Sequence, residues 1–144
     1  MKIKDLPAHT LDKVKHIVDL EIDATTKHRF RDVELPSPTG WHILVLQYVR
    51  PDRVGSIIMA DKTRDEDKYQ GRVGIVLDLG PDAYTDEDKF PTGAWCQPGD
   101  WIMWPAVEGA ARRFAYGKDA VLALVNDDSV LAVGVDPLRA VASG

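Results

Sequence analysis

The sequence predicts a mainly β protein, a small irregular β-barrel preceded by a short helical extension. From Gly40 onward, short runs rich in Val, Ile and Leu recur every ~8–15 residues with turn residues between them, which is typical of a small barrel or sandwich. Residues 1–38 instead place apolar side chains at helical spacing. The breaker cluster from Leu35 to Gly40 separates the two patterns. We therefore expect an extension over residues 1–38 and a barrel domain over residues 39–144.

The extension is predicted to contain one helix, from about Leu11 to Asp23, with Thr10 as its N-cap. Its apolar stripe consists of Leu11, Val14, Ile17 or Val18, and Ile22. A helix of this length is marginal in water alone, so the stripe needs a surface. It can pack on its own barrel, cap an assembled ring or bind a partner, and we favour packing on the assembled protein.

The barrel domain is predicted to contain a series of short strands, at Trp41 to Val49, Gly71 to Leu79, Trp101 to Trp104, Ala120 to Val125 and Ser129 to Val135. Pro98-Gly99-Asp100 has the composition of a tight turn, because Pro fixes φ and Gly accepts a positive φ. Residues 82–97 and 105–113 are expected to be loops. Open edges of so small a barrel need covering, so we expect pairing between neighbouring copies. The candidate seam joins residues 130–135 to residues 41–45.

The connection from Pro51 to Gly71 is rich in charged residues but carries three large apolar ones, Ile57-Ile58-Met59, directly after Gly55-Ser56. Such a composition predicts a mobile loop over about residues 51–70, since it cannot bury enough apolar surface to offset its ordering entropy. The tripeptide is costly to leave in water. It either folds back as a short strand on its own barrel or docks in the groove of a partner.

Composition excludes several classes of function. The formal net charge of −5 argues against nucleic acid or an anionic membrane as the main partner. One cysteine, Cys96, excludes an internal disulfide framework and fits a reducing cytoplasm. No apolar run approaches the ~20 residues that span a bilayer, and no signal-peptide core follows Met1. We expect a cytoplasmic protein.

Catalytic and metal-binding patterns are missing from the sequence. The four histidines are His9, His16, His28 and His42, and none has other ligands at zinc-site spacing. The acidic residues of 61–67 lack the alternation and central glycine of a calcium loop. Cys96 has no nearby histidine, and Asp86-Glu87-Asp88 has no surroundings that would raise a pKa for acid catalysis. We therefore expect no enzymatic activity, no metal and no cofactor.

Four motifs in this order resemble the GroES-type co-chaperonins, the lids of chaperonin cages, over residues Gly40 to Val141. The first is the strand at Trp41 to Val49 followed by Gly55-Ser56-Ile57-Ile58-Met59, which is similar to the family's Gly-Gly-Ile-Val-Leu. The others are the glycine-ended strand from Gly71 to Gly80, Pro98-Gly99-Asp100-Trp101-Ile102-Met103-Trp104, and Asp128-Ser129-Val130-Leu131-Ala132-Val133. The resemblance is carried by the ordered set, with the loop between the first two strands, rather than by any one motif.

The resemblance implies a heptameric dome of irregular GroES-like β-barrels. Mobile loops would hang from its rim and dock on a nucleotide-bound, GroEL-type chaperonin ring, with Gly55, Ser56, Ile57, Ile58 and Met59 as the binding residues. The chain departs from the family at Ser56, at Met59, in its charged loop and in its extension. These departures are more similar to a phage-encoded co-chaperonin than to a host one, which would place the protein in the host cytoplasm.

Three other readings remain open. An oligonucleotide-binding barrel would use exposed aromatics, but its basic face is missing, and Trp101 and Trp104 are expected to serve the core or a subunit seam. The barrel of a zinc-dependent dehydrogenase would need Cys and His ligands and a cofactor domain. A structural virion or scaffold protein without a chaperonin partner would use the extension as an attachment arm.

Overall fold

The computed structural model describes residues 1–18, 20, 30–48, 72–116 and 120–137. Its helical elements are η1 (Ile3–Asp5), α1 (Ala8–Val14), η2 (Phe30–Asp32) and η3 (Asp127–Ser129). Its strands are β1 (His42–Gln47), β2 (Arg72–Leu79), β3 (Trp101–Trp104), β4 (Ala111–Tyr116), β5 (Ala120–Asn126) and β6 (Ala132–Val133). Within the described part of the chain, no helix is long and apolar enough to cross a membrane.

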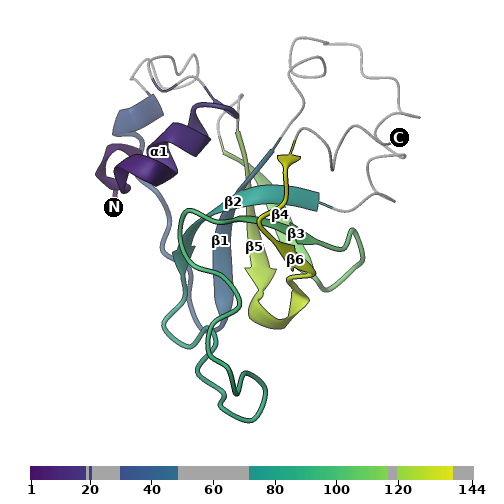
Figure 1. The fold of residues 1–144 in the computed structure, drawn as a ribbon. Coiled ribbons are helices and arrows are strands. Elements are labelled where there is room, and N and C mark those ends of the chain that lie inside the picture. The colour runs from purple at the N-terminus through teal and green to yellow at the C-terminus, as the bar shows by residue number, and fades with distance from the viewer. Residues whose placement is uncertain (19, 21–29, 49–71, 117–119, 138–144) are drawn as a thin grey trace, which may run out of the picture.

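The six strands form one antiparallel sheet in the order β4-β5-β1-β2-β3-β6 (Figure 1). This confirms the prediction of a mainly β protein with a short helix near the N-terminus. Among the described residues the sheet is not closed, because β4 and β6 lie at its two ends. β1 lies in the middle, paired with β2 on one side and β5 on the other. Both edges of β1 are therefore occupied, and the prediction that residues 41–45 form the seam between copies is wrong.

Both faces of the sheet are buried, each in its own hydrophobic cluster. Neighbouring residues of β1 alternate between the faces, since successive side chains of a strand point to opposite sides. Leu44 and Leu46 belong to what we call the extension-side cluster. Ile43 and Val45 belong to the opposite, loop-side cluster. This double burial explains why β1 reads as a continuous apolar run rather than an alternating one.

The extension-side cluster is the face that the N-terminal residues cover. Among the described residues, the extension contributes more than half of the buried members of this cluster, namely Ile3, Leu6, Val14, Val18, Leu20, Phe30 and Leu35. They pack with the strand residues Leu44, Leu46, Ile75, Leu77, Ala120 and Leu122. Figure 1 shows these N-terminal elements, in purple and blue, gathered against the sheet. The extension therefore forms part of the core, as expected for packing on its own sheet.

The loop-side cluster is covered by the connection between β2 and β3. Tyr84, Phe90 and Cys96 from this connection pack on Ile102, Trp104 and their neighbours in the sheet. Tyr84 and Phe90 meet edge to face, with ring centroids 4.8 Å apart. The backbone N–H of Tyr84 donates to Oδ2 of the buried Asp127 over 3.1 Å, which joins the loop to η3.

The bounds of the predicted helix are wrong. α1 begins at Ala8, directly after Pro7, whose fixed φ suits the position before a helix. Thr10 lies inside α1, fully buried, and caps nothing. After Val14 the backbone forms hydrogen bonds between residues three apart, as in the bond that the Ile17 N–H donates to the Val14 carbonyl over 2.9 Å. Ile22 lies outside the described residues.

Two strand bounds also differ from the prediction. β4 begins at Ala111, inside the region expected to be a loop, and its Arg112 and Arg113 pair with Leu124 and Ala123 of β5. Charged side chains are tolerated there because β4 is an edge strand with exposed positions. The last strand is shorter than predicted, since η3 precedes it and β6 holds only Ala132–Val133.

Candidate functional site

The apolar tripeptide Ile57-Ile58-Met59 and the Gly55-Ser56 before it lie outside the described residues. The strands β1 and β2 carry the two ends of the connection that contains them. β1 and β2 are antiparallel neighbours, with Gln47 opposite Gly74. The connection over residues 49–71 therefore leaves and re-enters the sheet at the same end, between two central strands. This pairing places the two ends of the connection close together. We call the described residues at these ends, Tyr48 and Arg72, its roots.

The root on the β1 side is Tyr48. Its backbone N–H donates to the Val73 carbonyl over 2.8 Å, which extends the β1–β2 pairing by one residue. The side chain is only 5% exposed and meets Trp101 edge to face, with ring centroids 6.2 Å apart. Backbone pairing and aromatic packing thus hold this root in place.

The root on the β2 side is Arg72, which is buried to 7% exposure and lies opposite Trp104 in the β2–β3 register. Two residues on, Gly74 lies close to β1, and a Cβ there would come within 2.6 Å of the Leu46 carbonyl oxygen. Only glycine fits this approach. The strand that receives the connection is therefore locked to β1 immediately after its root.

Cys96 is held in a state that disfavours nucleophilic chemistry. Its Sγ lies 3.5 Å from the Tyr84 hydroxyl inside the loop-side cluster. Burial raises the pKa of the Cys96 thiol, and burial together with the Cys96 contact raises the pKa of the Tyr84 phenol. The thiolate is the reactive form of cysteine. Both groups are therefore held protonated, and their contact serves packing.

The acidic run after Tyr84 organises a turn. Asp86 Oδ1 accepts hydrogen bonds from the backbone N–H groups of Asp88, over 3.0 Å, and Lys89, over 3.3 Å. The Lys89 ammonium reaches Asp128 Oδ2 over 2.9 Å. Across the described ranges, no three His, Cys, Asp or Glu side chains are grouped so that they could hold a metal ion.

Two of the described histidines, His42 and His9, contact different parts of the molecule. His42 Nδ1 lies 3.0 Å from the Thr39 carbonyl oxygen, and the exposed Trp41 ring stacks on the imidazole. His9, on α1, lies against the turn at Gly99, where a Cβ would come within 2.5 Å of its Nε2 atom. His28 is outside the described residues. Trp101 and Trp104 pack in opposite clusters, as expected for core residues.

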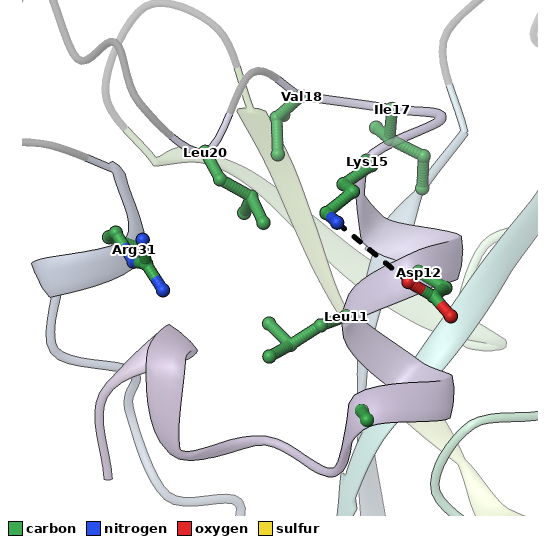
Figure 2. Close-up of a pocket in the computed structure, with 8 residues that line it drawn as sticks. Leu11, Asp12, Lys15, Ile17, Val18, Leu20 and Arg31 are labelled. Carbon is green, nitrogen blue, oxygen red and sulfur yellow. Dashed lines mark ion pairs between the residues drawn. The ribbon is translucent and has the colours of Figure 1, made fainter.

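Sequence reasoning missed a hollow in the extension (Figure 2). It has a volume of about 620 Å³ and lies between α1, the residues after it and Arg31 of η2. Leu11 and Leu20 point into it, and Lys15 pairs with Asp12 at its side over 3.8 Å. The apolar stripe gave a partial signal, since Val14 and Val18 of that stripe are buried while Leu11 and Ile17 are only partly so.

No protein-family model matches the chain, and no curated protein is significantly similar to it.

Proposed function

We propose that the protein is a co-chaperonin of the GroES type, which closes a GroEL-type chaperonin ring and so assists the folding of an enclosed polypeptide. The observation that carries the proposal is the position of the 49–71 connection. It joins the two central strands β1 and β2 at one end of the sheet, and it contains three adjacent apolar residues among many charged ones. Rigid roots with an apolar anchor between them suit a docking loop.

The order of the other motifs supports the same proposal. The glycine-ended motif falls on β2, and Pro98-Gly99-Asp100 forms the turn that opens β3. The motif from Asp128 to Val133 includes the last two residues of η3 and all of β6. Gly99 has a φ of 97°, which favours glycine, and its N–H donates to the Val76 carbonyl over 2.8 Å. The Pro98-Gly99-Asp100 motif therefore has a structural reason in this sheet beyond its resemblance.

The mechanism needs no catalytic group in the protein itself. Ile57, Ile58 and Met59 would each contribute about 1.5–3 kcal/mol on burial in a partner's groove, much of it offset by the cost of ordering the loop. One loop would bind weakly. A homo-oligomer, heptameric by the resemblance, gains avidity because its loops bind together, yet it can release when the partner's grooves change shape.

The test is a calorimetric titration of a nucleotide-bound chaperonin ring with the Ile58→Asp variant. We expect at least a tenfold loss of affinity, because a carboxylate replaces an apolar anchor in a dry groove. Thr63→Asp is the matched control, since it adds the same charge to the same connection outside the tripeptide, and it should bind like the unmodified protein. Circular dichroism checks that both variants keep the sheet.

Unchanged affinity of the Ile58→Asp variant would contradict the docking role of the tripeptide. An oligomer that binds no chaperonin at all would instead favour a structural scaffold protein.

A further inference from the structure

A hollow of about 590 Å³ lies where the β2–β3 connection meets η3 and the residue before β1. Most of its described lining is acidic or aromatic, namely Trp41, Asp82, Asp86, Phe90, Asp127 and Asp128. We call it the acidic hollow. Trp41 is 56% exposed, so the hollow is open to solvent at the indole. An accessible aromatic ring thus stands beside several carboxylates.

The charges of the acidic hollow do not balance. Lys89 is the one cation among the described residues of the lining, and Asp128 pairs with it over 2.9 Å. Because this pair is neutral as a whole, the excess negative charge comes from Asp82, Asp86 and Asp127. Asp86 accepts two backbone N–H bonds, which stabilise its carboxylate without cancelling its charge. The hollow is therefore a place of negative potential.

The buried carboxylate of Asp127 gives an independent sign that a cation belongs in the hollow. Asp127 is only 5% exposed and lines the hollow. Its Oδ2 accepts one bond, from the Tyr84 N–H over 3.1 Å, and within the described part of the chain it forms no ion pair. Buried carboxylates are ordinarily paired, because an uncompensated charge is costly to remove from water. A cation bound in the hollow would supply the pair.

Trp41 and the spacing of the carboxylates indicate the kind of cation. One face of the indole stacks on His42, with ring centroids 5.8 Å apart. Among the described residues no second ring packs on Trp41, so its other face is available to a cation. The described carboxylates are not grouped as a metal ion requires. Spread acceptors beside an aromatic plane suit a guanidinium, which is flat, weakly hydrated and donates in several directions.

We propose that the acidic hollow binds an arginine side chain of a partner polypeptide. The guanidinium stacks on Trp41, pairs with the buried Asp127 and is attracted by the exposed Asp82. A site for a free small molecule usually encloses most of its ligand. Here one wall is more than half exposed, which suits a single side chain of a larger partner. Tryptophan and arginine are also frequent anchors of protein interfaces. The proposal goes beyond the chaperonin contact and does not depend on it.

The test is an NMR titration of the full chain, followed through the indole N–H signal that Trp41→Leu removes. The probes are three capped peptides of the sequence Gly-Arg-Gly-Arg-Gly, in which arginine is kept, replaced by lysine or replaced by citrulline. The arginine peptide should shift the Trp41 signal saturably. Citrulline keeps the shape of arginine but not its charge, so its peptide should bind about tenfold more weakly. The lysine peptide should bind about threefold more weakly, because its ammonium does not stack.

Two variants remove one carboxylate each from the hollow. Asp127→Asn keeps an acceptor for the Tyr84 N–H and should weaken the arginine peptide about tenfold. Asp82→Asn should weaken it less, because Asp82 is exposed and solvent screens its charge. Glu87→Gln is the matched control, since it removes the same charge from the same connection outside the lining, and it should bind normally. Circular dichroism checks each fold, and the exposed Asp82 site keeps the test valid if Asp127→Asn does not fold.

Three results would overturn the proposal. The first is no saturable shift of the Trp41 signal at about 10 mM arginine peptide, where a contact with a millimolar Kd would be mostly occupied. The second is an equal loss in Glu87→Gln and in the hollow variants, which would indicate attraction to the net charge of −5 alone. The third is equal affinity for the lysine peptide. Ile58→Asp should bind the arginine peptide normally, so this outcome is separable from that of the chaperonin titration.

Discussion

Replacing Phe30 by Ala tests whether the N-terminal extension is half of the core or an appendage. Phe30 lies in η2, is 3% exposed and belongs to the extension-side cluster. Truncating a buried Phe to Ala costs about 3–5 kcal/mol, because it removes buried surface and leaves a cavity. A chain of this size typically has about 5–15 kcal/mol of stability. The variant should therefore melt roughly 6–20 °C lower than the unmodified protein.

Phe90→Ala is the matched control for this measurement. Phe90 is also 3% exposed but lies in the loop-side cluster, on the opposite face of the sheet. If both clusters belong to one cooperative unit, both variants should lower the free energy of unfolding by similar amounts in a single transition. Urea titration followed by tryptophan fluorescence and by circular dichroism gives both quantities.

The result that would refute this reasoning is specific. If Phe30→Ala changes the main transition by less than about 1 kcal/mol while Phe90→Ala changes it by the full amount expected for a buried Phe, the extension is an appendage. The same logic predicts the effect of deleting residues 1–36. Because the deletion removes seven apolar side chains that the described part of the extension buries in its cluster, it should abolish cooperative unfolding rather than only lower the melting temperature.

Two further predictions concern the loop-side half of the molecule. Gly99→Ala should destabilise the protein more than Gly93→Ala. Both glycines have a φ above 90°, but only at Gly99 would a Cβ meet another group, the His9 ring of α1. Equal losses of unfolding free energy in urea titrations would show that the contact with α1 does not contribute. The pKa values of Cys96 and Tyr84 are raised in the folded state, so the contribution of these two protonated groups to folding stability is complete at neutral pH. That contribution is lost as pH rises above about 8.5 for Cys96 and above about 10 for Tyr84. The free energy of unfolding should therefore fall at alkaline pH, less steeply in Tyr84→Phe, and a pH-independent value up to about pH 10.5 would contradict this assignment.

The sequence by itself determined most of the local structure. The strands β2 and β3 lie where their β-branched and aromatic runs predict them, and the turn at Gly99 follows from Pro98 before it and the positive φ that glycine accepts. These features depend on short-range sterics and on residue preference, which neighbouring residues contain. The apolar stripe of the extension also indicated correctly that this segment needs a surface.

Only the tertiary structure decided which strands are central and which are edges. The apolar run Ile43 to Leu46 is compatible with an edge or a central strand, and its pairing with β5, about eighty residues along the chain, places it in the middle. Arg112 and Arg113 suggested a loop, yet pairing with β5 makes them an edge strand. Both placements arise from non-local pairings with β5. Local composition cannot encode them, because register and edge position depend on partners distant in sequence.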